Sequence, residues 1–189
     1  MVASREWVTI PNLLSMLRLA LTPVFLVLIL ADQGLWALAV LAVAGASDWL
    51  DGKIARKFNQ ETRLGQLLDP AADRLYIFAA LIGLTATDHI PLWFAVAVIA
   101  RDALLLPSYL VLARRGWAPP PVTFLGKSAT FALLYALPLH LLAELLPGAD
   151  IFISPLAWAF GIWGLGLYWF AGLIYFRQVA NLFTRQNSN

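Results

Sequence analysis

The sequence predicts an all-α integral membrane protein with six transmembrane helices and a short interfacial segment at its N-terminus. Of its 189 residues, 61% are hydrophobic and 13% are charged, and the mean hydropathy is +0.76. Apolar runs of about 20 residues recur along the chain, and each is long enough to cross a hydrocarbon core of roughly 30 Å as a helix. Segments rich in glycine, proline or charge separate these runs. We therefore expect one membrane-embedded domain over 1–189, with an interfacial lead-in at 1–10 and helices near 12–30, 35–58, 66–87, 91–113, 122–145 and 155–183.

The N-terminal lead-in contains Arg5, Glu6 and Trp7, a combination typical of a segment that lies at the membrane interface. The apolar run at 12–30 is too long for the apolar part of a signal peptide, so we expect the protein to retain it as a helix. Its only charged residue, Arg18, has two interpretations: the side chain reaches back to the nearby interface, or it contacts a phosphate. The sequence favours neither, since Arg18 lies about 10 Å along the helix.

The helices at 35–58 and 66–87 each carry a pair of aspartates. Three small residues at 45–47 precede the first pair and permit close approach of a neighbouring helix or a ligand. Pro70 is acceptable in the first turn of the second helix. The second pair of aspartates therefore lies near a helix N-terminus, where the helix dipole favours anionic groups.

The helices at 91–113 and 122–145 carry few charges. The dipeptide Arg101-Asp102 lies midway along the first of them, where it forms either an internal ion pair with another helix or a functional contact. Arg114 follows the first helix, and Lys127 lies in the first turns of the second.

Basic and acidic residues fall on opposite sides of this arrangement. Under the six-helix assignment, the side of the two termini carries Lys53, Arg56, Lys57, Arg63, Arg114, Arg115, Lys127 and Arg185, and the opposite turns carry Asp32, Asp88, Glu144 and Asp150 without lysine or arginine. Positive loops stay cytoplasmic, so we expect a multi-pass protein whose termini and aspartate-rich stretch face the cytoplasm. The pI near 9.2 does not indicate nucleic-acid binding, because the net charge is only +2 and the basic residues are explained by topology.

The composition also excludes several kinds of site. The chain has no cysteine, so disulfides, thiolate metal sites and cysteine nucleophiles are not available. Its only histidines are His89 and His140, and so small a number argues against a histidine-ligated zinc or a Ser-His-Asp triad.

The spacing of the aspartates indicates a metal site. Asp48 and Asp51 are three residues apart, and Asp69 and Asp73 are four apart, so on helices each pair shares one face. Carboxylates in apolar membrane segments are costly and by default mark a functional site. Two such faces brought together form an oxygen-rich site for hard divalent cations such as Mg²⁺, which usually keep a substrate phosphate among their ligands.

Four carboxylates can hold two metal ions, and two metals suit an in-line displacement at phosphorus. A fourth carboxylate that is partly free of metal can then serve as the base for an acceptor hydroxyl. Gly52 and Ala55 have little side-chain bulk and would let a planar base approach the helix. Arg18, Lys127 and the aspartates at 48, 51 and 73 all fall two or three turns from the cytoplasmic helix ends, so they can meet in one cavity.

The stretch from Asp48 to Asp73 reads D-x2-D-G-x2-A-R-x8-G-x3-D-x3-D. It resembles the signature of the CDP-alcohol phosphatidyltransferase family and matches that signature at every fixed position. In that family the fold has six transmembrane helices, usually in a homodimer, and the signature spans the second and third helices. The resemblance implies a single catalytic domain of this fold that acts on CDP-diacylglycerol with Mg²⁺ or Mn²⁺, two ions per site.

The resemblance also implies a role for each fixed position. Asp48, Asp51 and Asp69 would ligate metal, and Asp73 would be both a ligand and the general base. The CDP portion would be bound by Asp48, Asp51, Gly52, Ala55, Arg56 and Gly65. The reaction would be attack of an acceptor hydroxyl on the β-phosphorus of CDP-diacylglycerol, with release of CMP.

Residues outside the signature resemble one branch of the family. The opening segment 10–12, with Ser15, Arg18 and Pro23, looks like phosphatidylglycerophosphate and cardiolipin synthases. Arg101-Asp102 and the segment at 124–130 look most like bacterial cardiolipin synthases that use CDP-diacylglycerol, which implies a bacterial inner membrane.

The acceptor alcohol has two candidates. Phosphatidylglycerol would give cardiolipin, and glycerol-3-phosphate would give phosphatidylglycerophosphate. Both carry a primary alcohol and an anionic phosphate, so the basic candidates suit either acceptor: Arg18, Arg101, Arg114 and Lys127. From a different class, a cation transporter would distribute acidic residues through both leaflets, whereas here the clustered acids lie on one side.

Overall fold

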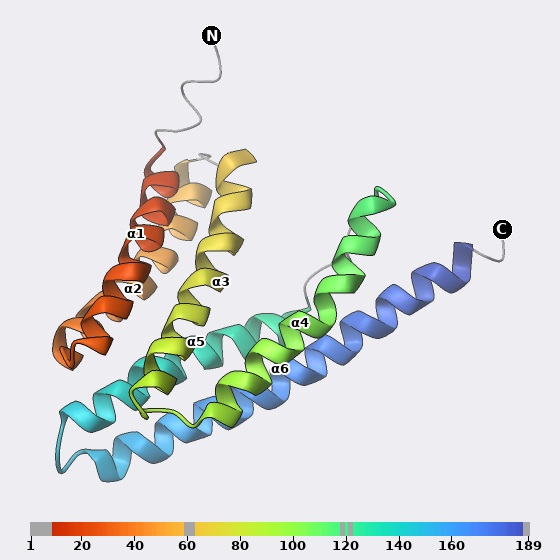
Figure 1. The fold of residues 1–189 in the computed structure, drawn as a ribbon. Helices are drawn as coiled ribbons and strands as arrows, with labels where there is room; N and C mark the ends of the chain where they lie inside the picture. The colour runs from red at the N-terminus through yellow and green to blue at the C-terminus, as the bar shows by residue number, and fades with distance from the viewer. Residues whose placement is uncertain (1–8, 59–62, 118–119, 121–122, 187–189) are drawn as a thin grey trace. The chain divides into compact units, whose positions relative to one another are not determined.

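The computed structural model describes residues 9–58, 63–117, 120 and 123–186, and it describes their side chains except at 10–11, 48–49, 51–58, 63–71, 73 and 185–186. Over these residues the chain is all-helical, with six helices joined by turns (Figure 1). They are α1 (Ile10–Leu30), α2 (Gly34–Phe58), α3 (Arg63–Ala86), α4 (Leu92–Arg114), α5 (Phe124–Leu145) and α6 (Asp150–Gln186).

Two helices, α3 and α6, begin at least three residues earlier than the sequence predicts. Helix α3 begins at Arg63 rather than near 66, since one glycine within a helix costs only about 1 kcal/mol. Helix α6 begins at Asp150 rather than near 155, and the amides of Phe152 and Ile153 both donate to the carbonyl of Ala149, 3.0 Å away. Pro155 thus lies inside the helix, where it removes one hydrogen bond without ending the apolar run.

The chain divides into two compact units. The first comprises residues 1–90 together with 141–148, and the second comprises residues 91–140 and 149–189. The boundary runs through α5, whose last turns belong to the first unit.

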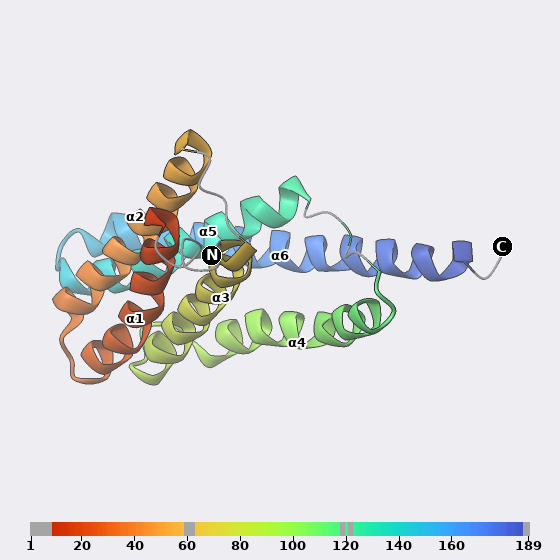
Figure 2. The same cartoon turned by 90° about the horizontal axis from the view of Figure 1, so that it is seen from above.

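In the first unit, α1 and α2 form an antiparallel hairpin, and α3 packs beside α1 (Figures 1 and 2). The turn between α1 and α2 is tight, with Asp32 at a φ of 59° and the amide of Gln33 donating to the carbonyl of Leu28 at 2.9 Å. Aspartate tolerates this left-handed conformation better than most residues do. The core of the hairpin contains the fully buried side chains of Phe25, Ile29 and Leu41.

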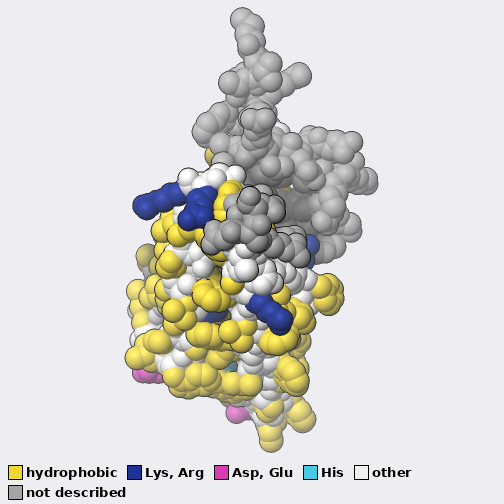
Figure 3. Space-filling view, turned by 90° about the vertical axis from the view of Figure 1, so that its right-hand side faces the viewer, with side chains coloured by type: hydrophobic (Ala, Val, Ile, Leu, Met, Phe, Trp, Pro, Cys, Tyr) yellow, Lys and Arg dark blue, Asp and Glu magenta, His cyan; other side chains and the backbone are white. Residues whose placement is uncertain are grey.

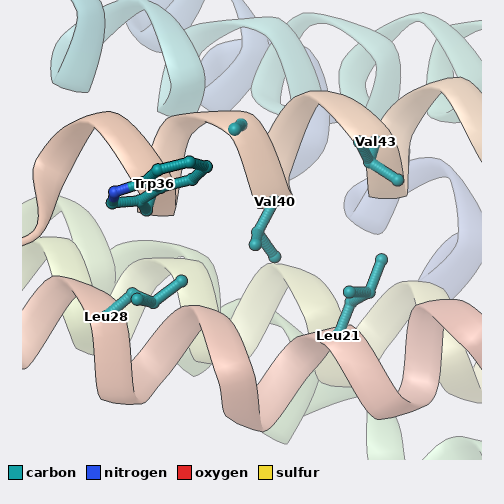
Figure 4. Close-up of a pocket in the computed structure, with 6 residues that line it drawn as sticks. Leu21, Leu28, Trp36, Val40 and Val43 are labelled. Atoms are coloured by element: carbon teal, nitrogen blue, oxygen red, sulfur yellow. The ribbon is translucent and has the colours of Figure 1, made fainter.

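Contacts between each pair of these helices determine how they are aligned along their length. Leu28 faces Trp36 and Leu21 faces Val43 across the α1–α2 pair (Figure 4). In α3, a Cβ added to Gly83 would lie 2.8 Å from Ile29 and 3.1 Å from Phe25 of α1. The Tyr76 hydroxyl of α3 donates to the Leu41 carbonyl of α2 at 3.0 Å.

In the second unit, α4 and the first part of α5 pack on α6. The Trp169 indole of α6 donates to the Ala97 carbonyl of α4 at 3.1 Å. Gly164 lets α6 approach α5, since an added Cβ would lie 3.1 Å from both Ala132 and the backbone nitrogen of Leu133. Small residues at helix contacts are the usual way for membrane helices to pack closely.

Four of the helices are long and apolar enough, over the residues described, to cross a membrane: Asn12–Leu30, Leu92–Arg114, Phe124–Leu145 and Asp150–Thr184. The described apolar parts of α2 and α3 are shorter, at Gly34–Ser47 and Arg74–Ala86. Most of the described surface in Figure 3 is hydrophobic, as expected of helices in contact with lipid. The chain is an integral membrane protein.

Candidate functional site

The predicted metal ligands lie on two helices of the first unit. Asp48 and Asp51 fall within α2, and Asp69 and Asp73 fall within α3. Their helical backbone gives each pair the spacing of a shared face. The side chains of all four lie outside the described residues, as do those of the other signature positions: Gly52, Ala55, Arg56 and Gly65.

The alignment of the helices brings one aspartate of each pair to the same level. Seven residues separate Leu41 from Asp48 on α2, and seven separate Tyr76 from Asp69 on α3. Because α2 and α3 are antiparallel, both steps run about 10.5 Å in the same direction from the hydrogen bond between Tyr76 and Leu41. The backbone of Asp48 therefore lies at about the depth of Asp69.

Arg18 lies at nearly this depth on α1. Leu21, three residues further along α1, faces Val43, so Arg18 is level with α2 close to Ser47. Its side chain is only 1% exposed. This burial argues against the interpretation that Arg18 reaches back to the membrane interface.

Arg18 belongs to a buried polar face of α1. Asn12 and Ser15 are also 1% exposed, and the Thr22 hydroxyl, 9% exposed, donates to the Arg18 carbonyl at 2.9 Å. Steps of three, three and four residues place the four side chains on one face of the helix. Since α1 packs against α2 and α3, this face turns toward the helices that carry the aspartates.

Asn12 and Ser15 were not among the site residues predicted from the sequence. The signal was available, because polar residues at helical spacing in an apolar span usually face the bundle interior. On α2, the buried Ser47 uses its hydroxyl within its own helix, 2.6 Å from the Val43 carbonyl and 3.0 Å from that of Ala44.

The second unit contains a separate polar cluster around Arg101. Its Nη1 donates to the Asp102 carboxylate at 2.8 Å, and its Nε donates to the Tyr168 carbonyl of α6 at 3.2 Å. The guanidinium carbon lies 4.0 Å from the centre of the Tyr168 ring, and the Tyr168 hydroxyl donates to the same Asp102 oxygen at 2.7 Å. Arg101 thus forms an ion pair within its own helix, to which α6 adds the Tyr168 contacts, whereas the sequence interpretation placed the partner on another helix.

Gly172 makes room for this cluster. A Cβ at this position would lie 3.1 Å from Nε and 3.5 Å from Cγ of Arg101. The charged side chains of Arg101 and Asp102 are 13% and 10% exposed. These contacts show that Arg101 is packed between α4 and α6 and that Asp102 neutralises its charge.

The remaining basic candidates lie at helix ends of the same unit. Arg114 is exposed in the last turn of α4, and Lys127 is exposed in the first turn of α5. The neighbouring Arg115 lies over the rings of Trp117 and Phe183. Of the four predicted acceptor contacts, only Arg18 belongs to the unit that carries the aspartates.

The metal site predicted from the sequence consists of the signature aspartates. Among the side chains that the structure describes, no three histidine, aspartate or glutamate residues come together in a group that could hold a metal ion. The donor set of the signature is four carboxylates on two helices, and such a set fits hard divalent cations.

Comparison with known proteins adds independent information. The model of the family described as CDP-alcohol phosphatidyltransferase matches residues 8–163 of this chain. A cardiolipin synthase (CMP-forming) of Streptomyces coelicolor is 51% identical over 180 residues, covering 92% of this chain and 84% of that protein. A CDP-diacylglycerol--glycerol-3-phosphate 3-phosphatidyltransferase of Bacillus subtilis is 36% identical over 151 residues, covering 72% of this chain and 78% of that protein.

A human cardiolipin synthase (CMP-forming) is 34% identical over 169 residues, covering 80% of this chain and 56% of that protein. The family match spans most of the chain and includes every signature position predicted from the sequence. The protein is an integral membrane enzyme that belongs to the CDP-alcohol phosphatidyltransferase family.

Proposed function

We propose that this enzyme transfers a phosphatidyl group from CDP-diacylglycerol to phosphatidylglycerol and so forms cardiolipin and CMP. The observation that carries the proposal is the complete burial of Arg18 on the face of α1 that packs against α2 and α3. A cation enclosed at nearly the depth of Asp48 and Asp69 suits a site for a diphosphate, since arginine binds phosphate oxygens through paired N–H donors.

In the proposed reaction, a hydroxyl oxygen of the acceptor attacks the β-phosphorus of CDP-diacylglycerol. Asp73 takes the hydroxyl proton, and the bond from the β-phosphorus to the bridging oxygen breaks. The bridging oxygen keeps the electron pair and leaves with CMP. Arg18 stays beside the phosphates throughout and offsets their negative charge.

The residues for metal would be Asp48, Asp51, Asp69 and Asp73, which suit two ions of Mg²⁺ or Mn²⁺. When bound, these ions would neutralise the diphosphate and the leaving oxygen. The CDP portion would lie along α2 and the start of α3, where Gly52, Ala55, Arg56 and Gly65 follow the family signature.

Glycerol-3-phosphate is the second candidate acceptor, because the Bacillus subtilis relative is named for transfer to it. The Streptomyces coelicolor relative is named as a cardiolipin synthase and shares more of its sequence with this chain. This greater identity favours phosphatidylglycerol as the acceptor. We also propose that all six helices cross a bacterial inner membrane, that the termini and the site face the cytoplasm, and that the enzyme is a homodimer.

The test supplies purified protein with CDP-diacylglycerol and each acceptor in turn. The proposal predicts cardiolipin and CMP from phosphatidylglycerol, with little product from glycerol-3-phosphate. Phosphatidylglycerophosphate as the main product would assign the second acceptor. Absence of product from both, in protein that is folded and metal-loaded, would contradict the proposal.

A further inference from the structure

The end of α4, in the second unit, carries two exposed arginines, Arg114 and Arg115. The 23 residues of α4 span about 34 Å at 1.5 Å per residue. The hydrocarbon core of a bilayer is roughly 30 Å thick, so a helix of this length that crosses it ends in the headgroup layer. Both arginines therefore lie at the depth of lipid phosphates.

A glycine C-cap folds the chain back at this end of α4. Gly116 has a φ of 68°, and its amide donates to the Ala113 carbonyl at 3.1 Å. The Trp117 amide donates to the Leu112 carbonyl at 3.0 Å. This pair of hydrogen bonds is a Schellman motif, which glycine favours because it has no Cβ. The Trp117 ring then meets Phe183 of α6, with the ring centres 5.2 Å apart.

The guanidinium of Arg115 lies over both rings. Its central carbon is 5.2 Å from the centre of the Trp117 ring and 4.9 Å from that of Phe183. Arginine that stacks on aromatic faces keeps its in-plane N–H donors available for another partner. Arg115 is exposed, and among the described residues these donors make no hydrogen bond or ion pair. The rings thus position a cation whose donors are still unused within this part of the chain.

The second unit has no acidic side chain at this end to neutralise the two arginines. It contains two acidic residues, Asp102 and Asp150. Asp102 pairs with Arg101 at 2.8 Å, and Asp150 lies in the first turn of α6, at the opposite end of that helix from Phe183. The positive charge at the end of α4 therefore has to be balanced from outside this unit.

We propose that Arg115 binds the phosphate of an anionic phospholipid in the adjoining leaflet. A guanidinium donates two parallel hydrogen bonds to phosphate oxygens, and tryptophan is enriched at the headgroup level. Arg114 adds a second positive charge beside the site. A general attraction of basic residues to an anionic membrane depends on net charge alone. A site built on Trp117 and Phe183 depends also on the planar guanidinium and on the rings beneath it.

The test places its reporter within the site. Protein made with 5-fluorotryptophan gives a fluorine NMR signal for each tryptophan, and Trp117→Phe assigns the signal of Trp117. Dioleoyl phosphatidylserine, titrated into the purified protein in detergent micelles, should shift this signal until it saturates, whereas dioleoyl phosphatidylcholine should not. Phosphatidylserine is neither the proposed donor nor a proposed acceptor, so this binding is measured without transferase activity and independently of the proposed function.

Three variants separate a built site from net charge. Arg115→Gln should raise the Kd for phosphatidylserine about tenfold, the effect of losing a charge-assisted hydrogen bond. Arg115→Lys and Phe183→Leu keep every positive charge but remove the planar donor group and one ring, so each should raise the Kd about threefold. The matched control is Arg177→Gln, which removes one exposed charge of α6 that has no ring contact among the described residues, and it should leave the Kd unchanged.

Equal losses of affinity in Arg115→Gln and Arg177→Gln would reduce the interaction to net charge and overturn the inference, as would unchanged binding in Arg115→Lys and Phe183→Leu. Inorganic phosphate at the same concentration should leave the Trp117 signal in place. An equal shift with inorganic phosphate, or with phosphatidylcholine, would contradict a site for anionic lipid. Unfolding midpoints show which variants are folded, and Arg115→Lys, at an exposed position, decides the matter if Phe183→Leu does not fold.

Discussion

The imidazole of His89 joins the end of α3 to the end of α5 through Glu144, with Nε2 2.9 Å from the carboxylate. The Thr87 hydroxyl donates to the Gly83 carbonyl at 2.9 Å, and Nδ1 of His89 lies 2.7 Å from this hydroxyl and 2.9 Å from the Thr87 carbonyl. His89 thus ties the last turns of α5 to the end of α3 within the first unit.

This pairing predicts that loss of His89 destabilises the protein more than loss of the Glu144 charge. Glu144→Gln should lower the free energy of unfolding by less than about 1 kcal/mol, because the glutamate is 58% exposed. His89→Ala should cost about 1–3 kcal/mol, since it also removes the contacts to Thr87. Asp88→Asn is the control at an exposed neighbour. Thermal unfolding compares the variants, and an unchanged midpoint in His89→Ala would contradict the role of His89 in joining these helix ends.

Two glycines offer a matched comparison for helix packing. Gly83→Ala should destabilise the protein by about 1–3 kcal/mol, because the new methyl group would lie 2.8 Å from Ile29 and 3.1 Å from Phe25. At Gly166 an added Cβ meets no atom within 4 Å, so Gly166→Ala should be neutral or stabilising by up to about 1 kcal/mol. Thermal unfolding in detergent compares the two variants, and equal midpoints would show that α3 does not pack on α1 in this way.

The contacts around Arg101 predict that removing the Asp102 carboxylate destabilises the protein more than removing the Tyr168 hydroxyl. Tyr168→Phe keeps the ring 4.0 Å from the guanidinium but removes the hydrogen bond to Asp102, so it should cost about 1 kcal/mol of stability. Asp102→Ala should cost more, about 3 kcal/mol or above, because it leaves a largely buried charge unbalanced. Unfolding measurements that reverse this order would show that Asp102 is not the main counter-charge of Arg101.

Asp73 is the proposed base, and Asp73→Asn should lower kcat by at least about 10²-fold. The fold should persist, as shown by an unchanged unfolding midpoint. Asp32→Asn, in the turn at the far end of α1, is the control and should keep full activity. Unaltered turnover in Asp73→Asn would remove this residue as the base.

Divalent cations should be required for turnover. Chelation with EDTA should stop the reaction, and Mg²⁺ or Mn²⁺ should restore it, because the carboxylates alone would repel the diphosphate. Full activity after exhaustive chelation would contradict the metal assignment.

Much of the fold could be predicted from the sequence because membrane helices need long apolar runs. The positions of all six helices follow from such runs, to within a few residues at most ends. The start of α6 could not, since Pro155 looks like a helix start although its ring is tolerated within the helix. The periodicity of apolar residues alone does not distinguish a proline at the start of a helix from one inside it.

The site was only partly predictable, because the sequence does not show which helix faces pack against one another. Fixed spacing singled out the aspartates, but the burial of Asn12 and Ser15 depends on which face of α1 meets α2 and α3. The two interpretations of Arg18 differ only in side-chain direction, which packing decides. The partner of Arg101 is its own neighbour Asp102 together with Tyr168, and a sequence separation of 67 residues conceals that second contact.

The central claim is that an acceptor oxygen attacks the β-phosphorus of CDP-diacylglycerol in the site formed by α1, α2 and α3. The most direct measurement follows a radiolabel in the β-phosphate while purified enzyme converts CDP-diacylglycerol and phosphatidylglycerol. The label should enter cardiolipin, with one CMP released for each cardiolipin formed, and both signals should vanish in Asp73→Asn. Recovery of the label in CDP instead would mean that a carbon–oxygen bond breaks, and it would contradict the proposed reaction.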